Sequence, residues 1–374
     1  MRTHLPLVRR TAIVAAFAIV ATACGGSDDT EPADTAEEDA AVEDDATGDD
    51  TTEDDAEEPE ATDDASGPLT VYSGRSEDLV GQVFEDFTAD TGIEVEVRYG
   101  DTAELASTIL EEGEASPADV YYAQDAGALG ALEAEGLFTT LPEDLVEVVD
   151  PNFRSPSGAW TGVTGRVRVI AYNTEELTED EVPDSVFTLT EPEWQGRVGW
   201  APTNGSFQAF VTAMRIEEGE DVTREWLEGM IANDVAVFEN NSSQVEAAAR
   251  GEIDLGLVNH YYLYRFLAED PDYPVANKFL SGDIGGLVNV AGVGVLESSD
   301  QQEAANQLVE FLLGEQTQTY FGQVTDELEL PLREGVDAPD LPALSELDPP
   351  EVDLSELEDL QGTLELLQEV GALE

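Results

Sequence analysis

Two adjacent tyrosines, Tyr261 and Tyr262, are the residues of this sequence with the most distinctive chemistry. A free phenol has a pKa near 10 and is a poor base at neutral pH. A bound hard, highly charged cation displaces both phenol protons and gains two anionic oxygen ligands. The alternative is a pair of core or cleft-rim aromatics whose hydroxyls form hydrogen bonds. The elements around the pair must decide between these two interpretations.

The tyrosine pair follows an apolar run over 253–258 that predicts a buried strand. Polar groups at the end of such a strand, where the chain enters a loop or helix, are where α/β folds place their ligand sites. Asn259 and His260 directly precede the pair. His260 can bind a metal or pair with a serine, but a lone histidine beside two tyrosines is more often a structural group with satisfied hydrogen bonds.

Two further polar turns lie between a predicted strand and a predicted helix. One contains Asn204, Gly205 and Ser206, and the other contains Asn241. Free backbone N–H groups at a helix start form a ready anion site. Asn and Ser at the same positions also serve as ordinary N-caps, and the residues alone favour that role.

Arg166 and Arg168 lie on one face of a strand predicted over 165–173, with valines on the other face. Arginines in such a position usually pair with carboxylates, and in a cleft they hold an anion through two parallel hydrogen bonds. The residues alone favour the structural role for either arginine.

The alternation of strands and helices over the remaining chain predicts parallel β–α–β units. The turn after the first strand lacks the glycine patterns of nucleotide-binding loops, and no serine-hydrolase or zinc-protease motif is present. The expected strands cover 69–72, 93–99, 118–122, 165–173, a segment from 197, 236–238, 253–258 and 287–296, and the expected helices cover 77–88, 102–112, 125–135, 207–217, 244–250, 301–313, 316–321 and 354–373. The polar turns around Ser73, Asn204 and Asn241 and the tyrosine pair then fall at strand ends beside helix starts, which is the layout of a ligand cleft between two α/β lobes.

The chain is strongly acidic, with 84 Asp and Glu against 15 Lys and Arg, for a formal net charge of −69. This charge argues against nucleic acid or an anionic membrane surface as a partner. The single cysteine excludes an intramolecular disulfide and a cysteine-based zinc site.

Residues 1–24 have the pattern of an export signal, with three arginines before a short apolar stretch over 11–23. Small residues precede Cys24, as in a bacterial lipoprotein signal, whose cysteine is lipidated and becomes the mature N-terminus. The alternative is an ordinary signal peptide with an incidental cysteine. Residues 25–68 contain 20 acidic residues and no basic or aromatic residue, which predicts a disordered tether. We expect an extracytoplasmic protein anchored to the cell membrane by Cys24.

From residue 69 to about 336, the chain resembles the ferric-ion-binding proteins, which are iron-delivering solute-binding components of bacterial ABC transporters. The segments that carry the resemblance are Thr70–Arg75, Ser116–Tyr122, Gly165–Val169, Trp194–Gly199, Asn240–Ser242, Asn259–Tyr262 and Glu329–Arg333. The family implies the two-lobe α/β fold of type II periplasmic binding proteins, with crossover hinge strands. We expect one lobe to contain 69–165 and 293–374 and the other to contain 166–292. The resemblance also implies closure around the ligand and docking on an ABC permease.

In that family, adjacent tyrosines are the core Fe(III) ligands, and here they correspond to Tyr261 and Tyr262. A synergistic anion, phosphate or carbonate, completes the coordination. The resemblance places this anion beside Asn204, Gly205, Ser206, Asn241, Asn259 and Arg166.

Three positions depart from the family pattern. Some members take a histidine from the first turn or a glutamate from the first lobe, where this chain has Ser76 and Gln124, with Asp125 next. Others use a third tyrosine at the position of Phe207. We therefore expect Tyr261 and Tyr262 to hold the metal with little protein help, supplemented by Gln124, Asp125, the anion or water. A ferric chelate is the alternative ligand.

Two rival classes of function remain. One is a solute-binding protein for a polyamine, which the aromatic, amide-rich site disfavours, or for an organic anion, which leaves the tyrosine pair unexplained. The other is a mononuclear metal enzyme, which needs an open coordination site and a positioned general base. No candidate base stands out, so we expect a monomeric binding protein without enzymatic activity.

Overall fold

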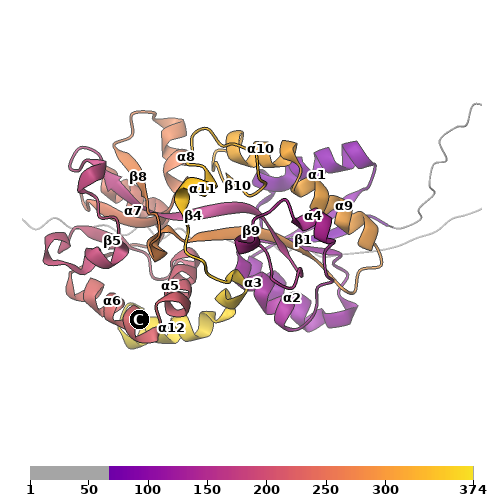
Figure 1. Cartoon of the computed structure of the whole chain (residues 1–374), viewed down its shortest axis with the longest axis horizontal. Helices are drawn as coiled ribbons and strands as arrows, with labels where there is room; N and C mark the ends of the chain where they lie inside the picture. The colour runs from indigo at the N-terminus through magenta and orange to yellow at the C-terminus, as the bar shows by residue number, and fades with distance from the viewer. Residues whose placement is uncertain (1–66, 374) are drawn as a thin grey trace, which may run out of the picture. The chain divides into compact units, whose positions relative to one another are not determined.

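The computed structural model describes residues 67–373. The expected signal peptide at 1–24, the lipidation site Cys24 and nearly all of the tether at 25–68 lie outside the described residues. Ten strands of the described part form one mixed sheet (Figure 1), in the order β2-β1-β3-β9-β4-β7-β5-β6, with β8 and β10 each paired to β4.

The strands are β1 (Leu69–Ser73), β2 (Val95–Tyr99), β3 (Val120–Ala123), β4 (Thr161–Asn173), β5 (Val198–Trp200), β6 (Ala236–Val237), β7 (Leu255–Asn259), β8 (Val275–Phe279), β9 (Val288–Val295) and β10 (Leu330–Pro331). The helices are α1 (Glu77–Thr91), α2 (Thr102–Glu112), α3 (Ala126–Ala134), α4 (Glu143–Val146), α5 (Gly205–Glu217), α6 (Glu220–Ala232), α7 (Asn241–Ala249), α8 (Tyr261–Glu269), α9 (Gln302–Leu312), α10 (Glu315–Gln323), α11 (Leu344–Leu347) and α12 (Leu360–Glu369), with a 3₁₀ helix, η7 (Leu354–Glu358), before the last. None of the helices within 67–373 is both long and apolar enough to cross a membrane.

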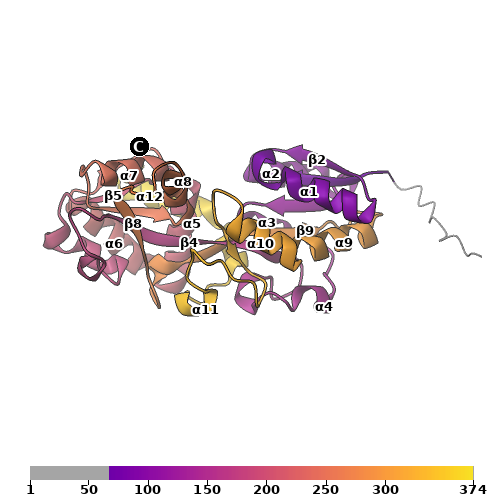
Figure 2. The ribbon, with the colours of Figure 1, turned by 90° about the horizontal axis from the view of Figure 1, so that it is seen from above.

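Strand β4 connects the two lobes. Up to Val167 it pairs with β9, and from Arg168 onward it pairs with β7 and β8. Figure 2 shows β4 and β9 running between a lobe that contains α1, α2 and α9 and a lobe that contains α5 to α8. All 13 residues of β4 are buried, as expected for a strand covered on both faces. The change of partner lies two residues beyond the lobe boundary expected at 165/166.

The strands within each lobe are parallel, as the strand–helix alternation predicts. In the first lobe, β1 is parallel to β2 and β3, and in the second lobe, β5 is parallel to β6 and β7. Strands β4 and β9 are antiparallel to each other, and each is antiparallel to a strand of a lobe, β7 for β4 and β3 for β9. Every antiparallel pairing of the sheet in the described chain, including those of β8 and β10, involves β4 or β9, which carry the chain between the lobes.

The C-terminal segment departs from the expected organisation. Instead of one helix over 354–373, η7 packs on α3 of the first lobe and α12 packs on α5 of the second. The Thr212 and Thr363 hydroxyls lie 2.7 Å apart, and Arg215 forms an ion pair with Asp359 at 2.9 Å. Residues 293–374 therefore do not all belong to the first lobe, although the sequence led us to expect that they would. Helix α12 packs on the second lobe, because α5 offers it both apolar and polar partners.

Helix α6 and strand β8 have no counterpart among the expected elements. In α6 the buried residues Thr223, Trp226, Leu227 and Met230 recur at helical spacing. Helix α6 could therefore have been predicted from the sequence alone. Strand β8 is half-buried and carries Asn277 and Lys278 in its interior, so its sequence is difficult to distinguish from that of a loop.

Four strand ends position the site. Strands β1, β3, β5 and β7 lead at their carboxyl ends into the starts of α1, α3, α5 and α8. These are the junctions at which α/β folds bind ligands.

Candidate functional site

Tyr261 and Tyr262 open helix α8 one residue after strand β7 ends. Their rings are stacked, with centroids 4.4 Å apart and 28° between the ring planes. Tyr261 is buried and Tyr262 is half-buried. Burial raises the pKa of the Tyr261 phenol, and Tyr262 adds to this rise. The Tyr261 phenol is therefore protonated until a cation displaces its proton.

Both tyrosines line two cavities. The larger, about 660 Å³, is also lined by residues of both lobes, including Gln124, Asp125, Arg166, Arg168, Asn204, Gly205, Ser206 and Asn259. The smaller, about 300 Å³, is also lined by Gly74, Arg75, Ser76, Leu79, Tyr99, Gly100, Gln124, Arg265 and Glu327. All the predicted site residues of the described chain except Asn241 line one of these cavities, and Asn241 contacts two residues that do.

The predicted anion turn is the N-terminus of helix α5. The Asn204 side-chain oxygen accepts from the Ser206 backbone N–H at 3.1 Å, from the Ser206 hydroxyl at 2.6 Å and from Asn241 Nδ2 at 3.1 Å. Asn204 is thus an N-cap, and Asn241 is held against it. The Asn241 Oδ1 is buried and has no partner within the described chain. The first N–H groups of a helix have no partner inside it, so this turn can also bind an anion.

Arg168 is the arginine that lies beside the anion turn. Its Nη1 lies 3.3 Å from Ser206 Oγ and 3.4 Å from Asn259 Oδ1. The guanidinium is buried, its Nη2 has no hydrogen-bond partner, and it forms no ion pair with any residue of 67–373. Burial lowers the pKa of Arg168 to about 10, so the side chain is still cationic at neutral pH. A buried cation without a counter-ion is costly, and an anion in the larger cavity would neutralise it.

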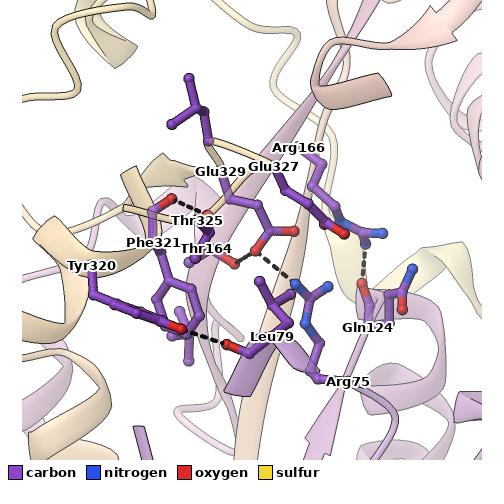
Figure 3. A network of polar contacts seen from close by, with 12 residues as sticks. Arg75, Leu79, Gln124, Thr164, Arg166, Tyr320, Phe321, Thr325, Glu327 and Glu329 are labelled. Carbon is purple, nitrogen blue, oxygen red and sulfur yellow. Dashed lines mark hydrogen bonds and ion pairs between the residues drawn. The ribbon is translucent and has the colours of Figure 1, made fainter. Parts of the chain in front are cut away.

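Arg166, the arginine expected beside the anion, reaches the first lobe instead. Its Nη2 donates to the backbone carbonyl oxygen of Gln124 (Figure 3). Arg166 lines the larger cavity, and its buried Nε has no partner in the part of the chain that is described. It therefore joins the two sides of the cavity, whereas Arg168 contacts the anion turn.

The two expected first-lobe candidates differ in their environment. Asp125 caps helix α3, accepting from the Ala128 N–H at 3.2 Å, and it lines only the larger cavity. Gln124 lines both cavities, and its backbone N–H donates to Thr102 Oγ1 at 3.2 Å. Gln124 therefore lines both cavities that contain the tyrosines, whereas the Asp125 carboxylate lines one of them and is hydrogen-bonded at a helix start.

Phe207 cannot replace a third tyrosine ligand. Its ring is buried and contacts Trp200 and Phe210, with ring centroids 5.4 and 5.9 Å away. The side chain therefore belongs to the aromatic core of the second lobe.

His260 is a structural residue, as the sequence predicts. It is completely buried, and Nδ1 accepts from the Val167 backbone N–H at 3.1 Å. The proton must then be on Nε2, which donates to the Leu328 carbonyl oxygen at 3.0 Å. Burial lowers the pKa of His260 to about 4, so the ring is neutral at physiological pH.

A turn at 325–329, between α10 and β10, brings in two carboxylates that the sequence-based prediction did not assign. The Glu329 carboxylate lies 2.8 Å from Arg75 Nη2 and 2.7 Å from the Thr164 hydroxyl, and all three residues are buried (Figure 3). Burial is the largest single effect and opposes ionisation of Glu329, but the charges of Arg75 and Arg166 and the hydrogen bonds from Thr164 and Arg75 together hold the pKa of Glu329 below its usual range. This ion pair fixes the turn to the end of β1.

The second carboxylate, Glu327, forms an ion pair with Arg265. The Arg265 guanidinium lies 5.6 Å from the ring centroid of Tyr261 and 5.4 Å from that of Tyr262. Arg265 could have been found from the sequence, because it is three and four residues beyond the tyrosines on the same helix face. Glu327 could not, since it is more than 60 residues from the pair.

The described chain contains no cluster of three His, Cys, Asp or Glu side chains that could hold a metal. Phenol oxygens, separate cavity-lining carboxylates such as Asp125 and Glu327, and an anion turn are therefore the metal-binding chemistry of this cleft.

Residues 115–352 match the family model described as bacterial extracellular solute-binding protein. The chain belongs to this family. It is 33% identical over 309 residues to the Fe(3+)-binding periplasmic protein of Serratia marcescens, covering 82% of this chain and 90% of that protein. The structure of iron-bound HitA from Pseudomonas aeruginosa superimposes with a TM-score of 0.73 at 35% identity, covering 81% of this chain and 99% of HitA.

A structure from Trichodesmium (IdiA, FutA), in complex with iron and citrate ligands, gives a TM-score of 0.72 at 27% identity and covers 82% of this chain and 99% of that one. Family members of this kind share the two-lobe type II periplasmic-binding-protein fold. Both the fold and the resemblance to ferric-ion-binding proteins, expected from the sequence, are confirmed.

Proposed function

We propose that this protein captures Fe(III) between its two lobes together with an anion and delivers the ion to an ABC permease. The observation that carries the proposal is that Tyr261 and Tyr262 line the same cavity as the N-terminus of α5 and Arg168. Two phenolates suit a hard trivalent cation. A helix start beside a buried arginine without a counter-ion suits an anion.

The residues divide between the two ligands. Tyr261 and Tyr262 supply the phenolate oxygens, and Gln124 and Asp125 are the candidates from the first lobe that line the same cavity. The anion, phosphate or carbonate, is held by Asn204, Gly205, Ser206, Asn241, Asn259 and Arg168, with Arg166 on the other side of the cavity. Because both lobes line this cavity, binding draws them together, and the closed form is the one that docks on the permease.

Iron titration of residues 25–374 in the presence of phosphate or carbonate tests the proposal. Tyrosinate coordination to Fe(III) gives a visible charge-transfer band, which the double variant Tyr261→Phe/Tyr262→Phe should lose. Tyr264→Phe is the matched control, because its hydroxyl lies on the same helix but bonds to the Asp340 carbonyl oxygen at 3.0 Å, and the residue lines neither cavity. A wild-type protein without the band in both anions contradicts the proposal.

A ferric chelate is the second candidate ligand. The larger cavity, about 660 Å³, exceeds what one ion and a carbonate occupy, and it is lined by two arginines, Arg166 and Arg168. The related Trichodesmium structure contains citrate together with iron. Calorimetric titration with ferric citrate, compared with Fe(III) and phosphate, separates the two, since a chelate-binding protein retains citrate in the complex. The two arginines disfavour a polyamine.

We propose that the protein binds and releases its ion without catalysis. His260, the histidine of the described chain, has both ring nitrogens hydrogen-bonded inside the protein and cannot serve as a general base. Incubation of the iron-loaded protein should leave the anion chemically unchanged.

The proposed location is extracytoplasmic, with a monomeric folded part anchored to the membrane through a lipidated Cys24. Mass spectrometry of the mature N-terminus should find an acylated Cys24, and the Cys24→Ser variant should be released in soluble form. An unmodified, processed wild-type protein contradicts the anchor and leaves the binding proposal intact.

A further inference from the structure

The smaller cavity beside the tyrosine pair contains a carboxylate that no sequence motif marks. Glu327 is the only carboxylate among the residues that line it. Ser76 and Gln124 also line this cavity. Some ferric-ion-binding proteins have an additional metal ligand at these two positions, but both side chains are neutral in this chain. The carboxylate of this cavity thus comes from the turn at 325–329.

Glu327 belongs to one cluster with the tyrosines. It pairs with Arg265, and the Arg265 guanidinium lies within 5.6 Å of both tyrosine ring centroids. The Glu327 side chain is 20% exposed, so it is accessible from the cavity yet partly shielded from water.

The residues on both sides of Glu327 are fixed. Leu328 has a positive φ of 46°, a conformation that a non-glycine residue keeps only where its surroundings impose it. Its carbonyl oxygen accepts from His260, the residue directly before the tyrosines. Glu329 is locked by Arg75 and Thr164. The turn is therefore built to hold residue 327 at the cavity, and the single ion pair with Arg265 is the contact that can be exchanged.

We infer that Glu327 leaves Arg265 when the ferric ion arrives and becomes a third protein ligand beside Tyr261 and Tyr262. The inference rests on the proposed function of ferric capture. Two phenolates and one carboxylate balance the three charges of Fe(III), which leaves the charge of the synergistic anion to Arg168. Arg265 remains over the tyrosine rings, where a cation is stabilised by their π faces and by the phenolate charge.

The substitution Glu327→Gln tests this assignment, because it keeps the shape of the side chain and removes its charge. We expect a shifted charge-transfer band, an altered Fe(III) electron paramagnetic resonance spectrum and an affinity weakened by about tenfold or more in chelator competition. Glu334→Gln is the matched control, since Glu334 is exposed and lines neither cavity. Glu327→Asp shortens the side chain and keeps its charge, and it serves as a second test if Glu327→Gln does not fold. It too should shift the charge-transfer band.

Arg265→Met separates a ligand from a residue that only positions Arg265. A ligand role predicts that Glu327→Gln changes the resonance spectrum even in a protein that already carries Arg265→Met, because the carboxylate acts on the ion and not through Arg265. The inference is overturned if Glu327→Gln adds no change to the spectrum of Arg265→Met, or if the spectra and affinities of Glu327→Gln and Glu327→Asp match the wild type. These outcomes presuppose a wild-type band that depends on Tyr261 and Tyr262. A wild type without that band overturns the proposed ferric function and, with it, the assignment of Glu327.

Discussion

His260 and Leu328 are joined by a hydrogen bond of 3.0 Å, from Nε2 of the ring to the backbone carbonyl oxygen. One partner directly precedes the tyrosine pair, and the other directly follows Glu327. The same ring accepts from Val167 of the crossover strand β4 through Nδ1. A buried, neutral histidine thus ties the start of α8 to the hinge strand and to the turn that carries Glu327.

This neutral histidine predicts a loss of stability in acid. The pKa of His260 is lowered to about 4 in the folded protein, whereas the unfolded value is about 6.5. As pH falls below 6.5, the unfolded state binds the proton first, so the stabilising contribution is complete above pH 6.5 and disappears by about pH 4. The full change is on the order of 3 kcal/mol. Denaturant unfolding of wild type and His260→Gln at pH 7, 5.5 and 4 should show a difference in unfolding free energy that shrinks as pH falls. A difference that is constant over this range contradicts the prediction.

The buried Arg75–Glu329 ion pair should be essential for stability. Glu329→Gln leaves the Arg75 guanidinium buried without its counter-ion, and removal of one partner of such a pair costs about 3–5 kcal/mol. Equilibrium urea unfolding measures this loss. Glu252→Gln removes one partner of the exposed Arg250–Glu252 pair and should leave the unfolding midpoint unchanged. Equal effects of the two substitutions would show that burial of the Arg75–Glu329 pair has no energetic consequence.

Arg168 should make the metal-free protein responsive to anions. Phosphate at 100 times its Kd stabilises the folded state by about 2.7 kcal/mol if it binds only that state. We expect phosphate, added at constant ionic strength, to raise the thermal midpoint of the wild type but not of Arg168→Gln, because that variant has no buried cation at the anion turn. The exposed Arg250→Gln substitution is the control and should respond like the wild type. The same phosphate response in Arg168→Gln and wild type argues against an anion at this turn.

Iron binding should release protons from the tyrosine pair. Because burial raises the pKa of Tyr261, its phenol is protonated before the ion arrives, and coordination must displace that proton. Affinity for Fe(III) should therefore increase with pH. Proton release, measured with a pH indicator in weakly buffered solution, should be about one proton per ion lower for Tyr261→Phe than for wild type. The comparison cancels protons that come from the anion, and equal release from the two proteins excludes Tyr261 as a phenolate ligand.

Much of the site follows from local sequence. A buried strand ending in Asn259 predicts that the tyrosine pair lies at a strand end. The turn from Asn204 to Ser206 likewise predicts a helix start, and both positions line the larger cavity. These features depend on neighbouring residues only: strand periodicity, an N-cap and the point where one element gives way to the next. The fold class could be predicted for the same reason, because the alternation of strands and helices follows from local patterns in chain order.

The tertiary structure decided which arginine lies beside the anion turn, which carboxylate lies beside the tyrosines and which lobe α12 covers. Arg166 and Arg168 share one face of β4 by strand periodicity, but the strand changes partners between Val167 and Arg168, so the first reaches Gln124 and the second reaches Ser206. Glu327 lines the same cavity as Tyr261, and the hydrogen bond between His260 and Leu328 joins the residues next to each of them. Local patterns fix where elements begin and end, whereas contacts between distant segments depend on how the lobes pack, which no short stretch of sequence encodes.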